Sequence, residues 1–272
     1  MVQIKPDIYS VGAIDWDRRL FDELIPLPDG TSYNAYLIKG GEKNALLDTV
    51  DPTKTTALID NLVKAGIDKI DYIVAHHAEQ DHSGSIPDIL MLYPDAKVVT
   101  NPKCKSMLID LLNIDEHKFI TVDDGQVLSL GEKTLQFIYI PWVHWPETMG
   151  TYLQEDKIFF PCDFFGSHLA TSNLFAADDE AVVYEAAKRY YAEIMMPFRA
   201  VIKKNLEKIE RLQIDMIAPS HGPVYDRAAF IIDAYKDWIS DAVKNEVVLA
   251  YISMHDSTRR MVEYFVDSLI ER

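Results

Sequence analysis

One six-residue run constrains the fold of this chain more than any other stretch: residues 77–82 read His-Ala-Glu-Gln-Asp-His and hold four potential metal ligands. The apolar residues 72–75 just before them predict a buried strand. Ser85 and Pro87 just after them are typical of a helix start, and this helix is expected to run to about Tyr93. The four ligands are therefore expected on a tight strand-to-helix loop, where the sheet holds them and the strand end leaves them open to a ligand.

Three more polar residues follow predicted strands in the same way. His144 comes after the apolar run 137–140, Asp163 comes after 158–160, and His221 comes after 216–218. Because open sheets present their sites at strand ends, these loops can converge on one point. We therefore expect one metal-binding site, built from His77, Glu79, Asp81, His82, His144, Asp163 and His221.

Composition narrows the class of protein. The 272 residues can bury one large core, and 43 acidic against 27 basic residues give a net charge of −16. This acidity disfavours nucleic acid and anionic membranes as partners. No stretch approaches a membrane span, and no signal peptide is expected. The two cysteines, Cys104 and Cys162, favour a reducing cytoplasm over a disulfide scaffold, and Cys162 is interpreted as a small buried apolar residue.

Short strands and helices alternate through most of the sequence. Asp51-Pro52 and Asn101-Pro102 are typical helix starts, each a capping residue followed by proline. Four strands predicted between residues 126 and 160 lie too close together for helices between them. A strand is also predicted at 97–100, and helices at 179–193, 198–212 and 226–243. This mixture predicts two sheets with helices outside, an α/β sandwich.

A separate pattern begins after Asn245. Residues 247–252 are fully apolar and predict a strand, 253–258 a loop, and 259–270 a helix. Such a strand, loop and helix opens a doubly wound nucleotide- or flavin-binding domain. Helical spacing puts Met261, Phe265 and Leu269 on one apolar stripe, which indicates a packing role.

The ligand set favours iron over zinc. Three carboxylates and four imidazoles are too many for one ion, but they suit two divalent ions that share one carboxylate. Imidazole-rich sets are typical of hydrolytic zinc, whereas mixed carboxylate and imidazole sets suit iron or manganese. Glu79 adds a second carboxylate to its loop, which shifts the balance towards redox-active iron and leaves zinc as an alternative.

The combined motifs resemble those of flavodiiron proteins. The matching segments are His-x-Glu-x-Asp-His at 77–82, Val-His-Trp-Pro-Glu-Thr-Met around His144, Cys-Asp-Phe-Phe-Gly around Asp163 and Pro-Ser-His-Gly-Pro around His221, with 15–21 and 30–36 in support. The resemblance covers residues 1–245. It implies a metallo-β-lactamase-like αββα sandwich that carries a diiron site.

The same resemblance implies the cofactors and their ligands. Two iron ions would be bound, one by His77, Glu79 and His144, the other by Asp81, His82 and His221, with Asp163 bridging them. Some relatives leave the histidine at the place of His82 out of the coordination sphere. Hydrolytic relatives have histidine in place of Glu79, which supports the redox branch of the fold.

Other residues near these motifs are expected to support the site rather than to bind metal. His76 and His168 are interpreted as partners of the ligands or as structural residues, and His117 as solvent-exposed. The aromatic residues that could wall a gas pocket, although core packing explains each of them better, are Trp145, Phe164, Phe165, Tyr190 and Tyr191.

The C-terminal segment departs from the family pattern. A flavodoxin-like domain needs about 140 residues, an ordinary domain size, whereas residues 246–272 form only a truncated strand, loop and helix, expected to pack on the main domain. Its loop has Ser253, Ser257 and Thr258, but Asp256 stands where a phosphate-binding loop needs glycine. Because the carboxylate would repel a phosphate, the loop is interpreted as vestigial and no FMN is expected.

Three functions are compatible with these expectations. The first is a cytoplasmic, homodimeric diiron protein that binds dioxygen as an oxygen sensor linked to signalling, with a chemoreceptor as a possible partner. The second is an oxygen or nitric oxide reductase that receives electrons from a separate flavodoxin or rubredoxin. The third is a zinc hydrolase. None of them needs nucleic acid or a membrane.

Overall fold

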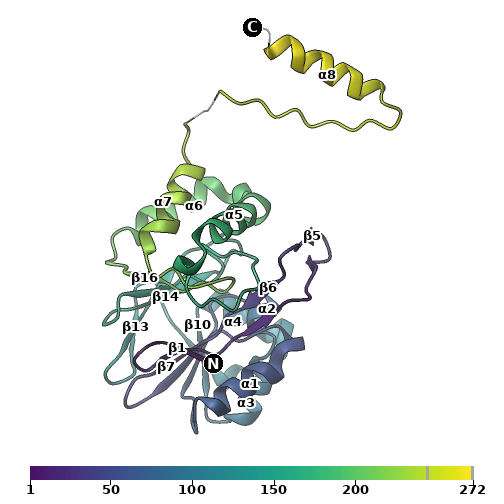
Figure 1. The fold of residues 1–272 in the computed structure, drawn as a ribbon. Coiled ribbons are helices and arrows are strands. Elements are labelled where there is room, and N and C mark those ends of the chain that lie inside the picture. Colours follow the sequence, from purple (N-terminus) through teal and green to yellow (C-terminus); the bar gives the residue numbers. More distant parts are fainter. Residues whose placement is uncertain (243–244, 271–272) are drawn as a thin grey trace. The chain divides into compact units, whose positions relative to one another are not determined.

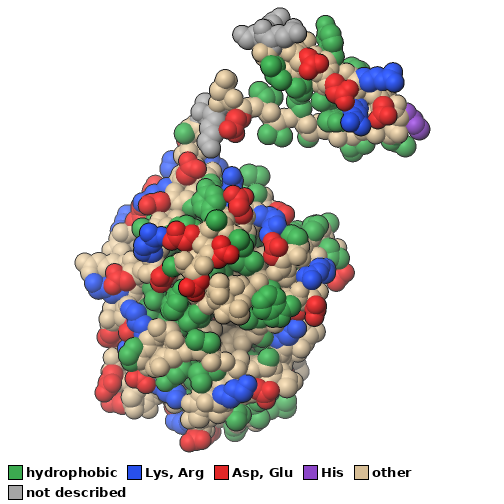
Figure 2. Space-filling model, in the orientation of Figure 1, with side chains coloured by type: hydrophobic (Ala, Val, Ile, Leu, Met, Phe, Trp, Pro, Cys, Tyr) green, Lys and Arg blue, Asp and Glu red, His purple; other side chains and the backbone are tan. Residues whose placement is uncertain are grey.

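The computed structural model describes residues 1–242 and 245–270. The chain divides into two compact units, Met1–Ile239 and Ser240–Arg272, which are taken separately below. Within the described residues, no helix combines the length and apolar character needed to cross a membrane. On the face of the first unit visible in Figure 2, acidic and basic side chains are interspersed.

The first unit is built on two main sheets (Figure 1). The seven-stranded sheet has the order β1 (Val2–Lys5), β2 (Ile8–Ser10), β7 (Tyr36–Lys39), β8 (Asn44–Leu47), β9 (Tyr72–Val74), β10 (Lys97–Thr100), β11 (Phe119–Thr121). The five-stranded sheet has the order β12 (Val127–Ser129), β13 (Thr134–Tyr139), β14 (Met149–Leu153), β15 (Ile158–Phe160), β16 (Met216–Ile217). Two short antiparallel pairs accompany them: β3 (Ala13–Asp15) with β6 (Thr31–Tyr33), and β4 (Leu20–Phe21) with β5 (Ile25–Pro26).

Helices cover the outer face of each sheet. The seven-stranded sheet is covered by α1 (Thr55–Lys64), α3 (Ile86–Leu92) and α4 (Pro102–Leu112), and the five-stranded sheet by α5 (Glu180–Tyr190), α6 (Arg199–Ile209) and α7 (Ala228–Trp238). Short helical turns lie at Pro52–Lys54, Glu116–Lys118, Ala176–Asp178, Tyr191–Met195 and Met196–Phe198. The predicted αββα sandwich is therefore confirmed.

Three apolar cores join the four layers. The central core lies between the sheets and contains Leu47 and Val74 from one sheet and Phe137 and Phe160 from the other, all fully buried. The two outer cores pack each sheet against its helices. Because burying one such side chain stabilises a fold by about 1.5–3 kcal/mol, the sheets are a firm base for the loops that leave them.

Most predicted elements are confirmed, with differences at their ends. The run 77–82 is not all loop, because Gln80–Ser83 forms the short helix α2: the amides of His82 and Ser83 both donate to the carbonyl oxygen of Glu79, at 3.1 and 2.9 Å. The helix predicted at 226–243 is α7, which ends at Trp238, and the predicted end at Val243 lies outside the described residues.

The second unit differs from its prediction in one element. Residues 247–252 do not form a strand, because no described strand pairs with them and a lone strand has no ladder of hydrogen bonds. The predicted helix is confirmed as α8 (Ser257–Ile270). Asp256 has a φ of 60°, the left-handed conformation that glycine adopts without cost and aspartate tolerates.

Candidate metal centre

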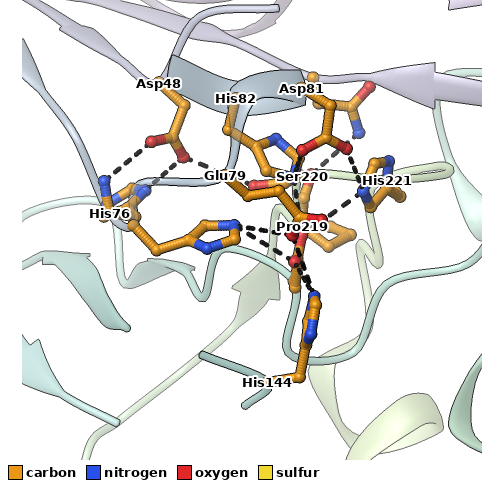
Figure 3. A network of polar contacts seen from close by, with 12 residues as sticks. Asp48, His76, Glu79, Asp81, His82, His144, Pro219, Ser220 and His221 are labelled. Atoms are coloured by element: carbon orange, nitrogen blue, oxygen red, sulfur yellow. Dashed lines mark hydrogen bonds and ion pairs between the residues drawn. The ribbon is translucent and has the colours of Figure 1, made fainter. Parts of the chain in front are cut away.

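The seven predicted ligands come together beyond the ends of strands from the two main sheets. Figure 3 labels Glu79, Asp81, His82, His144 and His221 among them. His77 and Glu79 follow β9, and Asp81 and His82 lie on α2. The other three reach the same place from the loops after β13, β15 and β16, and they are His144, Asp163 and His221. All seven side chains are buried or nearly so; that of His144 is the most exposed, at 13%.

Asp163 lies at the middle of the cluster. Its Oδ2 is 3.3 Å from Nε2 of His77 and 3.1 Å from Nε2 of His144. Its Oδ1 is 2.9 Å from Nε2 of His82 and 3.5 Å from Nε2 of His221. The two carboxylate oxygens therefore face two different pairs of imidazoles.

Each pair of imidazoles has its own second carboxylate. Glu79 Oε2 lies 3.1 Å from Nε2 of His144 and 3.9 Å from Nε2 of His77. On the other side, Asp81 lies 3.3 Å from Nε2 of both His82 and His221, through Oδ1 and Oδ2 respectively. The arrangement thus has the two groups of three that the resemblance implies, with Asp163 between them.

The donor atoms are arranged to bind metal ions rather than to form hydrogen bonds with one another. Nε2 of all four histidines, Oε2 of Glu79 and both oxygens of Asp81 and Asp163 are buried, yet none of them has a hydrogen-bond partner among the described residues. Buried polar atoms in folded proteins almost always have a hydrogen-bond partner, so a cluster of unpaired ones indicates a site for a ligand. Ligand atoms of Asp81, His82 and His221 lie within 4.8 Å of one another, as do those of Glu79, His144 and Asp163, which is close enough for each group to surround one ion.

The electrostatics of the cluster favour the charged forms of His82, His144 and Asp81. Burial lowers the pKa of His82, but Asp81 and Asp163 outweigh it and raise this pKa to about 10. Burial also lowers the pKa of His144, while Asp163 and Glu79 raise it to about 10. Burial raises the pKa of Asp81, but His82 and His221 together outweigh burial and lower this pKa to about 2. Because metal ligation needs neutral imidazoles, ion binding must release protons from this cluster.

Main-chain groups orient His221. Nδ1 of His221 lies 2.7 Å from the carbonyl oxygen of Ser32, and the hydroxyl of Ser32 accepts from the amide of Gly222 at 2.8 Å. Asn34 donates to the carbonyl oxygens of Pro219 and Gly222, at 2.9 and 2.7 Å. The β6–β7 segment therefore holds the loop of His221 in place and turns Nε2 towards the carboxylates.

Asp48 and Thr49, just after β8, hold the other ligand loop at its two ends. Asp48 accepts from the amide and from Nδ1 of His76, at 2.9 and 2.6 Å, and Nε2 of His76 lies 2.8 Å from the hydroxyl of Thr151. The amide and hydroxyl of Thr49 donate to the carbonyl oxygen of His82, at 2.7 and 2.6 Å. His76 is thus a structural residue, as predicted.

The other residues singled out in the sequence lie in different settings. Nδ1 of His168 lies 2.9 Å from the hydroxyl of Thr31, in a supporting role, and His117 is exposed beside Asp115, as expected. Cys162 is buried, and burial raises the pKa of its thiol, which keeps it protonated and inert. The predicted FMN-loop residues lie in the second unit.

Of the five aromatic residues for which core packing was the preferred prediction and a pocket wall the alternative, only two are close to the rings of the cluster. The ring of Trp145 is 5.6 Å from that of His77, and the ring of Tyr190 is 6.0 Å from that of His221. Phe164, Phe165 and Tyr191 instead pack against Tyr235 in the core. Two aromatic residues outside the prediction face His221 edge-on: Phe21 at 6.5 Å and Tyr33 at 6.0 Å.

Sequence reasoning missed the residues that hold the ligand loops. Thr31 and Ser32 fall in the segment 30–36, which resembled the family, but nothing in that segment pointed to a contact with His221. Glu147 falls in the motif around His144, and its carboxylate faces the other ligand loop. Asp48 had no signal beyond its place at the end of a strand.

The chain matches a family profile and a named relative. A family profile described as "ODP family beta lactamase" matches residues 31–222. A nitric oxide reductase of Moorella thermoacetica is 39% identical over 276 residues, which cover 99% of this chain and 69% of that protein.

Solved structures give the same result. The rubredoxin oxygen:oxidoreductase of Desulfovibrio gigas matches with a TM-score of 0.94 and 30% identity, over 99% of this chain and 69% of the other. The flavodiiron protein of Giardia intestinalis matches with a TM-score of 0.83 and 34% identity, over 88% of this chain and 59% of the other. The chain thus spans between 59% and 69% of the length of these three proteins.

Proposed function

This chain belongs to the flavodiiron family, and from that premise we propose that it is a diiron oxidoreductase that reduces dioxygen or nitric oxide with electrons from a separate carrier. The observation that carries the proposal is the division of the ligand cluster around Asp163. One carboxylate whose two oxygens face two separate groups of ligands is suited to a pair of ions and is not needed for a single one.

The proposed ligand sets follow the two groups. His77, Glu79 and His144 would hold one iron ion, Asp81, His82 and His221 the other, and Asp163 would lie between the two. When bound, such a pair supplies the one-electron chemistry that amino-acid side chains lack. The protein's own part is to orient the imidazoles, through contacts such as that of His221 with Ser32, and to exclude water with Phe21, Tyr33 and Trp145.

The names of the relatives favour the reductase over the oxygen sensor. The protein from Moorella is a nitric oxide reductase and that from Desulfovibrio is an oxygen oxidoreductase, whereas neither name supports a link to chemoreceptors. The sensor thus gains no support, and the reductase, which ranked second on the sequence alone, becomes the leading function. Glu79 in the cluster weighs against the zinc hydrolase, since hydrolytic zinc favours imidazole.

The electron donor follows from the same names. The Desulfovibrio relative is named for rubredoxin, so a rubredoxin or a flavodoxin is the first donor to try. The expectations that this chain binds no FMN and forms a homodimer stay predictions.

The test is anaerobic loading with ferrous iron, followed by metal analysis and by a gas electrode. We expect about two irons per chain and sustained consumption of dioxygen or nitric oxide when reduced rubredoxin is supplied with its reductase. Oxygen uptake of about one equivalent with no recycling by any donor would restore the sensor. Zinc uptake with esterase activity would restore the hydrolase.

Two variants make this test specific. His77→Ala removes a proposed ligand and should abolish consumption, whereas His117→Ala removes an exposed histidine and should leave it unchanged. Equal activity in the two variants would place the chemistry somewhere other than this cluster.

A further inference from the structure

Glu147 is a buried carboxylate that the proposed chemistry does not use. Its side chain is 3% exposed, and Oε1 accepts from the amide of Ala78 at 3.0 Å. Oε2 is also buried and has no hydrogen-bond partner among the described residues. Because a buried carboxylate with so few partners costs stability, its single hydrogen bond invites a functional explanation.

The bond between Glu147 and Ala78 joins two ligand segments. Ala78 lies between His77 and Glu79, while Glu147 is three residues after His144. These three neighbours form one of the two groups of proposed ligands. The bond therefore sets the distance between the loop that provides two members of the group and the loop that provides the third.

Both sides of this bond are anchored. The carbonyl oxygen of Glu147 accepts from the side-chain amide of Asn101 at 2.6 Å, and Oδ1 of Asn101 caps the first turn of α4 through the amide of Cys104 at 2.9 Å. On the other side, the carbonyl oxygen of Ala78 accepts from the hydroxyl of Ser83, in α2, at 2.8 Å. Glu147 thus connects the ligand loop to the capped end of a helix outside the site.

We propose that Glu147 is a positioning residue, which aligns His77, Glu79 and His144 for one of the two ions without binding either. This inference rests on the proposed function only in requiring that the cluster takes two divalent ions. The second group, Asp81, His82 and His221, has separate supports in Thr49 and Ser32. Loss of the Glu147 contact should therefore weaken the binding of one ion and leave the binding of the other unchanged.

Three variants separate the effect of side-chain length from the effect of charge at Glu147. Glu147→Gln keeps an oxygen that can accept from Ala78 but loses the charge, whereas Glu147→Asp keeps the charge on a side chain one methylene shorter. Glu147→Ala removes both. Glu155→Ala is the matched control, because Glu155 also accepts from a main-chain amide, that of Thr134 at 2.8 Å, at the start of β13 and so at the opposite end of that strand from the loop of His144.

The readout is an anaerobic titration of the metal-free, full chain with cobalt(II), followed by visible absorption. We expect E147A and E147D to take the first ion normally and the second roughly 10–100-fold more weakly, the usual effect of losing a group that supports a ligand. E147Q should restore the second ion, and E155A should bind both ions unchanged. Should E147A fail to fold, the contrast between E147Q and E147D decides the question.

Two results would overturn the proposal. Unchanged binding of both ions by E147D, with the spectrum of the original chain, would show that the contact does not position the ligands. Weak binding by E147Q with normal binding by E147D would show that charge, rather than position, is what Glu147 provides. Since cobalt binding needs neither iron nor turnover, failure of gas reduction would defeat the proposed function and leave this result standing.

Discussion

Nδ1 of His221 lies 2.7 Å from the carbonyl oxygen of Ser32, which leaves Nε2 as the atom that faces Asp81 and Asp163. The contact joins two segments that are distant in sequence, and it fixes both the tautomer and the ring orientation of the histidine. In metal sites the loss of such a partner typically weakens metal affinity by about 10–100-fold. The loop of His221 is therefore the first place to test the structure.

Gly222→Ala should destabilise the protein and weaken metal binding. Gly222 has a φ of +79°, and a Cβ there would lie 2.0 Å from Oγ and 2.7 Å from the carbonyl oxygen of Ser167. The backbone strain costs about 1–3 kcal/mol, and relieving the clash costs about as much again. Urea unfolding of the metal-free chain measures the loss.

A second glycine provides the control for this prediction. Gly66 has a φ of +61°, but its Cβ would have nothing within 4 Å. Gly66→Ala should therefore cost only the strain of about 1–2 kcal/mol and leave metal affinity unchanged. If both variants lose the same stability and bind metal equally well, the packing around Gly222 is wrong.

Asp163→Ala should lose both ions, whereas His144→Ala should lose one. Asp163 presents one oxygen to each group, so its removal takes an anionic ligand from both. The carboxylate oxygens beside Nε2 of His144 are Oε2 of Glu79 and Oδ2 of Asp163, which belong to one group. Metal analysis after anaerobic loading with ferrous iron, then desalting, gives ions per chain. Loss of a single ion in Asp163→Ala would contradict the shared carboxylate.

The sequence predicted the fold and the ligand cluster for different physical reasons. The apolar runs of the strands and the proline starts at Pro52 and Pro102 were sufficient for the layers, because the relevant signals are local. The cluster was predictable because each ligand follows a strand, and strand ends meet at one edge of a sheet. The contacts of Ser32 and Glu147 were not predictable, since they depend on how loops from different strands approach one another.

In the C-terminal unit the sequence predicted a strand that the described residues do not form. Residues 247–252 are apolar enough to predict a strand, but hydropathy measures only the tendency to be buried. A strand also needs a neighbour to complete its hydrogen bonds, and none of the described strands pairs with these residues. Helix α8 was predicted correctly because a helix satisfies its own main-chain bonds.

Stability of the metal-free protein should fall as pH rises from about 6.5 to 10. The pKa values of His82 and His144 are raised from 6.5 to about 10 by their carboxylate neighbours. A histidine whose pKa is higher in the folded than in the unfolded state stabilises the fold fully at pH values below its unfolded-state pKa. This stabilisation is lost as the pH rises through the folded-state pKa. Iron or cobalt should reverse the trend, because the ions take the place of the protons. Urea midpoints measured with and without metal test both directions.

Tyr190→Phe should leave the stability of the metal-free protein unchanged or raise it slightly. The hydroxyl of Tyr190 is buried without a hydrogen-bond partner among the described residues, so it carries a desolvation cost and no compensating bond. Tyr36→Phe is the matched comparison, because the buried hydroxyl of Tyr36 donates to the carbonyl oxygen of Pro219 at 2.7 Å. Its removal should cost about 1–3 kcal/mol and loosen the loop of His221. Equal losses of stability in the two variants would mean that the hydroxyl of Tyr190 has a hydrogen-bond partner. If that hydroxyl gains a partner only when metal or gas is bound, Tyr190→Phe should lower activity without lowering stability.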